Sequence, residues 1–338
     1  MTTPLLELRG VTRHFKVGTG LSRRALHAVD DVDLTVGERE ILALVGESGS
    51  GKSTLARLVA QVHRPTRGEI RYQGRPLTEQ RGRRAKLAYR GAVPMVFQDP
   101  FSALNPAYRV SHGILRGITL HQPQLGRAER QSEAERVTEA VGLAPDVLDR
   151  FPHELSGGQR QRIGFAQALA HRPRLILADE PVSMLDVSIR IGLLNVMADL
   201  RETENVSILY ITHDIASARY LSDRIAVMYG GHIVETGPTE EVLAHPRHPY
   251  TDLLLSAVPD PRAPLDVDAA TAKSDPPVVI DPTPGCRFRA RCPLATAVCD
   301  RITPRLEPVA TSHTAACHVT APGTPGTPGA PEALGADA

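Results

Sequence analysis

The chain has 338 residues, of which 41% are hydrophobic and 23% are charged, a composition that is ordinary for a soluble globular protein of one large or two modest domains. The formal net charge is +1, so no bulk basic field indicates binding to nucleic acid or to an anionic membrane. Because no apolar run approaches the roughly 20 residues that span a bilayer and no secretion signal is recognised, we exclude an integral membrane protein and expect the cytosol.

Strand patterns dominate the first part of the chain. Residues 5–15 and the alternating residues 29–36 are typical of half-buried strands. The continuous apolar run 41–45 is typical of a strand buried on both faces. A glycine-rich turn follows this run, and residues 53–62 have a helical pattern. A further short strand is expected directly before Gln98.

Helical patterns dominate the middle of the chain. Residues 99–155 are mostly helical in pattern, and a helix is expected to begin at Ser156 and to end before Pro173. Short apolar runs at residues 174–179 and 208–212 predict two more buried strands. Alternation of strands and helices predicts an α/β fold with a mainly parallel sheet.

The last part of the chain changes in composition. Residues 223–237 predict a hairpin that turns at Gly230-Gly231. Prolines become dense after about residue 245, and residues 259–284 are typical of a linker or a loosely packed extension. The low-complexity segment 319–338 is expected to be disordered.

A phosphate-binding loop is the strongest motif. Residues 46–53 fit the pattern G-x-x-x-x-G-K-[ST] between a buried strand and a helix. Such a loop points several backbone N–H groups at the β- and γ-phosphates, and the helix N-terminus adds its positive end. Lys52 is expected to neutralise phosphate oxygens and Ser53 to ligate Mg²⁺. The residues assigned to the nucleotide here are Gly46, Glu47, Ser48, Gly49, Ser50, Gly51, Lys52, Ser53 and Thr54.

An acidic pair follows the strand predicted at residues 174–179. Alone, this pair is more typical of a solvated loop, but a nucleotide site needs a carboxylate for its Mg²⁺ and a group that positions water. We expect Asp179 to hold Mg²⁺, directly or through water. We expect Glu180 to act as the general base that polarises the attacking water.

Residues 155–159, Leu-Ser-Gly-Gly-Gln, stand at the start of the helix that is expected from Ser156. Ser156 is a good N-cap, and the helix dipole favours an anion there. The order and spacing of the phosphate loop, this segment and the acidic pair resemble the ABC (ATP-binding cassette) ATPase family. The resemblance covers about residues 5–250.

The resemblance implies roles for further residues. Gln98 resembles the glutamine that senses Mg²⁺ and the γ-phosphate, and His213 resembles the histidine that contacts the γ-phosphate. Phe15 resembles the aromatic residue that stacks on adenine. Residues 183–186 resemble the D-loop, which ends at Asp186, although Met184 stands where alanine is usual. The residues that would complete the site of a partner cassette are Ser156, Gly157, Gly158 and Gln159.

The family implies that two cassettes stack head to tail, with each ATP between one chain's phosphate loop and the other chain's signature, residues 155–159. The chain has one cassette and no room for a long inserted coiled coil, which favours a transporter with separate membrane subunits. Residues 96–106, 180–189 and 245–251 resemble the oligopeptide/dipeptide (and nickel) importers, and within them the second of two paired ATPases. We therefore expect a nucleotide-binding domain at residues 1–250, with a helical subdomain at about 99–172, and an extension at 251–318.

The resemblance implies a function and partners. The chain would hydrolyse ATP to power the import of di- and oligopeptides, at the cytoplasmic face of the cell membrane. Its partners would be a paralogous ATPase, or a second copy of the chain, two membrane permeases and an extracytoplasmic peptide-binding protein. No nucleic acid is expected. The alternatives are nickel or another small solute as cargo, or a soluble regulatory module that responds to ATP and redox state.

All cysteines of the chain lie within a short segment near its end. Disulfides are disfavoured in the cytosol, and four thiolates suit either Zn²⁺ or a 4Fe–4S cluster. The closely spaced cysteine pairs of structural zinc sites are missing, and the peptide-importer ATPases carry a similar pattern, in which some hold 4Fe–4S. Cysteines without a metal remain an alternative. His313 and His318 are possible ligands but are expected at the surface. The four cysteines are Cys286, Cys292, Cys299 and Cys317.

Overall fold

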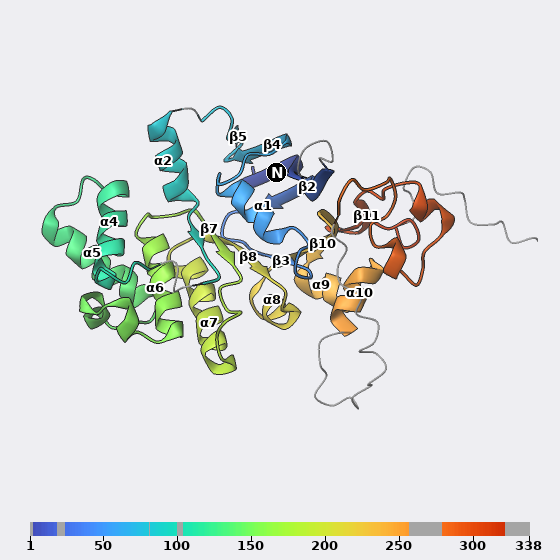
Figure 1. The fold of residues 1–338 in the computed structure, drawn as a ribbon. Coiled ribbons are helices and arrows are strands. Elements are labelled where there is room, and N and C mark those ends of the chain that lie inside the picture. The colour runs from blue at the N-terminus through green and yellow to red at the C-terminus, as the bar shows by residue number, and fades with distance from the viewer. Residues whose placement is uncertain (1–2, 19–23, 81, 100–103, 257–278, 322–338) are drawn as a thin grey trace, which may run out of the picture.

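The structure is a computed structural model that describes residues 3–18, 24–80, 82–99, 104–256 and 279–321. Figure 1 shows two sheets at the centre, a group of helices at one end and the C-terminal extension at the other. The α/β architecture predicted from the sequence is confirmed, because helices surround a largely parallel sheet.

The first sheet is antiparallel and comes from the N-terminal part of the chain. Its strand order is β2-β1-β4-β5. The alternation that predicted half-buried strands places Leu6, Leu8, Val32 and Val36 in the core. Its strands are β1 (Leu6–Val17), β2 (Arg24–Val36), β4 (Arg67–Tyr72) and β5 (Arg75–Pro76).

The second sheet carries the carboxyl ends at which the predicted site residues lie. Its order is β11-β12-β10-β9-β3-β8-β7-β6, and β3 runs parallel to both β8 and β9. Every residue of β3, β7 and β8 is buried, as their continuous apolar runs predicted. The strands are β3 (Ile41–Val45), β6 (Met95–Val96), β7 (Leu175–Asp179), β8 (Ser207–Thr212), β9 (Arg224–Tyr229), β10 (His232–Pro238), β11 (Glu307–Ala310) and β12 (His313–Ala315).

The helices divide between the sheets and a helical end of the molecule. There α4 packs on α5, and both pack on α6. The α-helices are α1 (Lys52–Val59), α2 (Arg83–Ala92), α4 (Val110–His121), α5 (Arg127–Ala140), α6 (Gly157–Leu169), α7 (Val187–Thr203), α8 (Ile215–Leu221), α9 (Thr239–Ala244) and α10 (Pro249–Ser256). Short 3-10 helices are η1 (Pro145–Asp149), η2 (Pro152–Glu154), η4 (Arg289–Arg291) and η5 (Ala297–Asp300).

The C-terminal extension is built onto the second sheet. Strand β12 pairs with β10, and Ile280 forms an antiparallel bridge with Leu26 of β2. The boundary expected between residues 250 and 251 falls inside α10. Most of the expected linker lies outside the described residues, as do residues 322–338 of the tail expected to be disordered. The extension therefore contacts both sheets of the cassette.

Two histidines of the extension are buried, so the expectation that they lie at the surface was wrong. The side chains of His313 and Glu235 are both 0% exposed and pair at 2.7 Å. His318 is 4% exposed, and its Nε2 lies 2.8 Å from the carbonyl oxygen of Ile302. The burial of His313 follows from the pairing of β12 with β10, which the short polar sequence around His313 did not signal.

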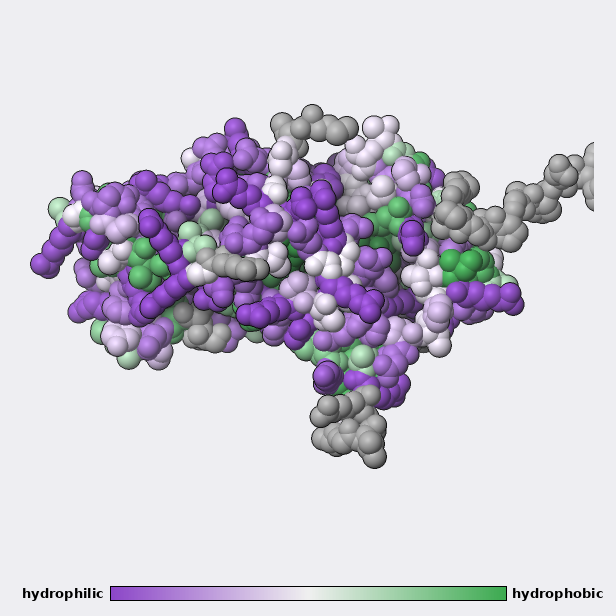
Figure 2. Space-filling view, turned by 90° about the horizontal axis from the view of Figure 1, so that it is seen from above, coloured by the Kyte–Doolittle hydropathy of each residue, from purple (hydrophilic) through white to green (hydrophobic). Residues whose placement is uncertain are grey.

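The surface is mostly hydrophilic on the face drawn in Figure 2, with small, separate hydrophobic patches. Among the described residues, no helix is both long and apolar enough to cross a membrane.

Candidate active site

The phosphate loop joins β3 to α1 and fits tightly against the neighbouring strands. A Cβ atom on Gly46 would lie 2.2 Å from the Met228 carbonyl oxygen, and one on Gly51 would lie 2.2 Å from the Ala28 carbonyl oxygen. Gly51 also has φ 110°, which L side chains rarely adopt. The close approach of backbone to backbone therefore requires glycine at both ends of the loop.

Lys52 lies inside the loop. Its side chain is buried, and its Nζ donates to the carbonyl oxygens of Gly46 at 2.6 Å and Glu47 at 2.9 Å. Burial lowers the pKa of Lys52, against the opposing effect of Glu180, Asp179 and Glu47. A buried ammonium that is held by carbonyl oxygens is well placed to exchange them for phosphate oxygens.

The expected Mg²⁺ ligands meet at the end of β7. Ser53 Oγ donates to Asp179 Oδ1 at 2.9 Å. Burial raises the pKa of Asp179 and the neighbouring Glu180 adds to the rise, while the Ser53 hydroxyl opposes it. A divalent cation would relieve the repulsion between these carboxylates, and hydroxyl and carboxylate oxygens are the ligands that Mg²⁺ prefers.

Glu180 lies at the centre of a second set of contacts. Gln98 Nε2 donates to Glu180 Oε2 at 3.3 Å, and His213 Nδ1 lies 3.3 Å from the same oxygen. Gln98 Nε2 also lies 3.4 Å from Ser183 Oγ. The φ of Glu180 is 47°, an uncommon value for a residue other than glycine. The structure thus brings together the three residues expected to handle the γ-phosphate and its attacking water.

The signature segment lies elsewhere in the same chain. Ser156 caps α6: its Oγ accepts from the Gln159 amide at 3.2 Å, and Gln159 Oε1 accepts from the Ser156 amide at 3.0 Å. A Cβ atom on Gly158 would meet Ile189 of α7, and one on Gly157 would approach Leu185. Among the described residues, no hydrogen bond joins residues 156–159 to the phosphate loop.

Three other predicted residues lie around this centre. Phe15 is half-buried near the end of β1, with the Arg13 guanidinium 4.5 Å above its ring and His63 against its edge. Asp186 is the N-cap residue of α7, and its carbonyl accepts the first helical hydrogen bond, from Arg190. Thr54 lies in the first turn of α1.

Sequence reasoning missed two residues that contact Glu47 of the phosphate loop. The Glu47 amide donates to Tyr250 Oη at 2.8 Å, and Arg291 pairs with the Glu47 carboxylate through two bonds. Both residues lie far from the loop in sequence, and neither belongs to a motif that signals a nucleotide. Only the tertiary structure brings them to the loop.

His14, His27 and Asp30 form a cluster with metal-ligand atoms within 4.8 Å of one another. His27 Nδ1 lies 2.8 Å from Asp30 Oδ2, and Arg287 pairs with the same oxygen. Burial would raise the pKa of Asp30, but its bonds with His27 and Arg287 outweigh this and lower it to about 2. The guanidinium already neutralises this carboxylate, so the cluster is an ion-pair network that ties the extension to β2.

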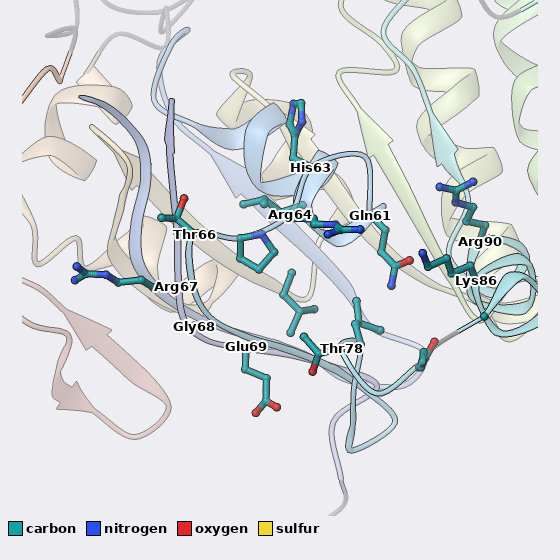
Figure 3. A pocket seen from close by; sticks show the side chains of 16 residues that line it. Gln61, His63, Arg64, Thr66, Arg67, Gly68, Glu69, Thr78, Lys86 and Arg90 are labelled. Atoms are coloured by element: carbon teal, nitrogen blue, oxygen red, sulfur yellow. The ribbon is translucent and has the colours of Figure 1, made fainter. Parts of the chain in front are cut away.

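A hollow of about 640 Å³ lies between β4, α2 and the segment after α1. Figure 3 shows the basic side chains along it, among them Arg64, Arg67, Lys86 and Arg90. None of the residues assigned to the nucleotide lines it. The hollow therefore does not hold the assigned phosphate-binding residues, although its lining residue His63 contacts Phe15.

The fold and the loop before α1, with an acidic pair at the end of β7, define a P-loop nucleotide-binding protein. Residues 29–183 match the family described as ABC transporter, and residues 234–299 match the oligopeptide/dipeptide transporter C-terminal region. The second match includes three of the four cysteines and ends before Cys317.

Relatives agree with this class. The oligopeptide transport ATP-binding protein AppF of Bacillus subtilis is 41% identical over 93% of this chain and 97% of its own length. The probable peptide ABC transporter ATP-binding protein y4tS of Sinorhizobium fredii is 41% identical over 95% and 92%. The solved dimer of the ABC cassette MJ0796, bound to ADP and Pi, covers 69% of this chain and 98% of its own, with a TM-score of 0.62 and 28% identity. The chain belongs to the ABC transporter family and is an ATPase of its oligopeptide/dipeptide transporter branch.

Proposed function

We propose that the chain is the ATP-hydrolysing subunit that powers import of di- and oligopeptides across the cytoplasmic membrane. Family membership supplies ATP binding and hydrolysis. The peptide cargo is supported by the names of relatives that match almost the whole chain, among them AppF and y4tS. The observation that carries the proposal is the convergence of Gln98 and His213 on Glu180, beside the Ser53–Asp179 pair.

The proposed roles follow from these contacts. Lys52 and the loop amides hold the phosphates, and Ser53, Asp179 and Gln98 hold the Mg²⁺ ion. Glu180 accepts a proton from the attacking water, and His213 fixes Glu180 and contacts the γ-phosphate. Phe15 would stack on the adenine from the edge of the first sheet.

We propose that two cassettes close head to tail around ATP. The signature lies apart from its own phosphate loop, so a second chain would have to supply it. Large apolar side chains around the D-loop support such an interface, because Met184 is 61% and Val187 is 70% exposed. The dimeric structures of MJ0796 have the same fold. We propose a paralogous cassette as the partner, with a second copy of the chain as the alternative.

The membrane subunits would dock near Gln98. Phe97, within the segment 96–106 that resembles the importer subfamily, is 47% exposed, and Tyr108, just after that segment, is 48% exposed. Two permeases docked there would hold the chain peripherally at the cytoplasmic face of the membrane. Peptide selectivity would lie in an extracytoplasmic binding protein.

We also propose that the four cysteines hold a 4Fe–4S cluster. All four thiols are free, and Cys286 lies near enough to the other three that each influences its pKa. Burial raises the pKa of Cys286 to about 11 and also raises the pKa of Cys292, and backbone N–H groups of Phe288 and Leu294 oppose these shifts. The cysteines are not among the groups of described residues with three ligand atoms within 4.8 Å.

Iron and acid-labile sulfide in anaerobically purified protein test the cluster. About four of each per chain would support it. Zinc, or neither iron nor sulfide, would contradict it, and the ATPase proposal would be unaffected.

The cargo is tested by uptake in cells that lack the chain. Labelled dipeptide and labelled nickel are supplied in parallel, with and without a plasmid that restores the chain. Restored dipeptide uptake is expected. Rescue of nickel uptake alone would overturn the peptide cargo, and rescue of neither would favour a regulatory module.

A further inference from the structure

Glu47, the second residue of the phosphate loop, is paired with an arginine from the C-terminal extension. Arg291 Nη1 and Nη2 lie 2.8 and 2.9 Å from the two oxygens of the Glu47 carboxylate. The side chains are only 12% and 25% exposed. A bidentate pair of this kind fixes direction as well as charge, because the planar guanidinium matches the carboxylate.

Arg291 is held in place by an aromatic cluster. Its guanidinium carbon lies 5.8 Å from the ring centroids of Tyr229 and Phe288. Tyr250 packs against both rings, and its hydroxyl accepts the Glu47 amide. Phe288 and Tyr250 are almost completely buried. The guanidinium is therefore positioned before any nucleotide arrives, and little conformational entropy remains to be lost.

The segment from Cys286 to Cys292, here called the strap, carries both this arginine and a second anchor. Arg287 pairs with Asp30 and donates to the Gly230 carbonyl oxygen. The next residue, Gly231, donates through its amide to the Ser50 carbonyl oxygen of the phosphate loop at 2.9 Å. The strap thus contacts the phosphate loop directly through Arg291 and indirectly through Arg287 and Gly231. Its first and last residues are cysteines.

The charge of Glu47 explains why the pair matters for ATP. Lys52 Nζ donates to the Glu47 carbonyl oxygen at 2.9 Å, and the Glu47 carboxylate opposes the lowering of the Lys52 pKa by burial. This carboxylate therefore acts on the place where anionic phosphates bind. An unpaired carboxylate there would repel the nucleotide. Arg291 neutralises this charge through its two hydrogen bonds to the carboxylate.

We propose that Arg291 is a positioning residue for ATP, through which the cysteine-bearing extension sets the affinity of the phosphate loop. It acts on Glu47, not on the nucleotide itself. The inference rests on the proposed function for the assignment of ATP to this loop. By reciprocity, ATP in the loop would stabilise the strap and its cysteines to the same extent.

The test is a double-mutant cycle on the full chain, read by equilibrium binding of a fluorescent ATP analogue with Mg²⁺. Arg291→Gln should weaken binding about tenfold, because it leaves Glu47 unpaired beside the phosphates. In the Glu47→Gln background the same change should weaken binding less than about twofold, because no carboxylate remains to be neutralised. Arg291→Lys keeps the positive charge but loses the bidentate geometry. Its affinity for the ATP analogue should lie between those of the wild type and Arg291→Gln.

The matched control is Arg289→Gln. Arg289 lies in the strap but pairs with Asp300 and the Cys286 carbonyl oxygen, not with the loop. Arg289→Gln should leave binding of the ATP analogue unchanged, both in the wild-type chain and in the Glu47→Gln background. If Arg291→Gln does not fold, the same cycle can be measured with Arg291→Lys, Glu47→Gln and the variant that combines them.

Equal losses from the Arg291 variants in both Glu47 backgrounds, or no loss in either, would overturn the coupling. A wild-type chain that does not bind the probe would overturn the ATP site itself, and the inference with it.

Discussion

At the scale of single residues, Gly51 is, with Gly46, one of the two tightest points of the phosphate loop. A side chain there would collide with the Ala28 carbonyl oxygen at 2.2 Å, whereas one on Gly49 would meet nothing within 4 Å. Both residues have positive φ, so alanine strains the backbone at either position by about 1 kcal/mol. Only at Gly51 does overpacking add a further cost of about 2 kcal/mol.

We therefore predict that Gly51→Ala lowers the free energy of unfolding of the nucleotide-free chain by about 3 kcal/mol, and Gly49→Ala by about 1 kcal/mol. Urea unfolding of the two variants checks this difference. Equal losses would mean that the loop relaxes around the new methyl group and that the close approach to β2 is unimportant.

His248 predicts a pH dependence of stability. Burial lowers its pKa from 6.5 to about 4, and its Nδ1 accepts the Tyr250 amide at 3.0 Å. Since the unfolded chain takes up this proton at a higher pH than the folded chain, the stabilising effect is present above pH 6.5. It is lost as the pH falls from 6.5 toward 4.

His248→Asn should make stability less sensitive to pH, because asparagine keeps an acceptor for the Tyr250 amide but does not titrate. Between pH 7 and pH 5 the wild type should lose about 2 kcal/mol more unfolding free energy than the variant. Urea unfolding at the two pH values measures this difference. A variant that loses as much as the wild type would show that His248 does not carry the effect.

At the scale of elements, α6 serves both stability and the proposed site. Ser156 and Gln159 form a reciprocal capping box that satisfies two amides of the first turn. The same turn is the one that would face the γ-phosphate of a partner cassette, and it carries no charged side chain among residues 155–159. A substitution that keeps the cap but adds a negative charge can therefore separate the two roles.

We predict that Ser156→Asp folds with near wild-type stability, because aspartate is also a good N-cap. ATP-dependent dimerisation should be lost, since the new carboxylate would repel the γ-phosphate. Ser156→Ala is the contrasting variant, with a loss of about 1 kcal/mol of stability. Thermal unfolding and sedimentation with ATP measure the two effects. Normal dimerisation of Ser156→Asp would contradict the proposed role of the signature.

Elements with a strong apolar pattern could be predicted from the sequence. The strand expected at residues 41–45 is β3 itself, and the hairpin expected to turn at Gly230-Gly231 is β9 and β10. Helix α2 gave no such signal, because only two of its residues, Tyr89 and Gly91, are buried. Strand β12 is three residues long, and its pairing with β10 depends on long-range contacts.

At the scale of the whole molecule, the acidic pair after a buried strand predicted Glu180, and the family resemblance implied Gln98 and His213, which contact it. Sequence patterns could not show that the extension reaches the same loop. The Arg291–Glu47 pair and the Tyr250 hydroxyl join segments more than 200 residues apart. Such contacts depend on how the extension folds back over the cassette, which no local periodicity encodes.

The central claim is that this cassette hydrolyses ATP with Glu180 as the general base. Glutamine at this position keeps hydrogen-bonding capacity toward Gln98 and His213 but cannot accept the proton of the attacking water. The most direct measurement compares ATP turnover and bound nucleotide in the assembled transporter with wild-type chain and with Glu180→Gln. We predict that the variant retains bound ATP while its turnover falls at least about 100-fold. Turnover at the wild-type rate would contradict the assignment of Glu180 as the base.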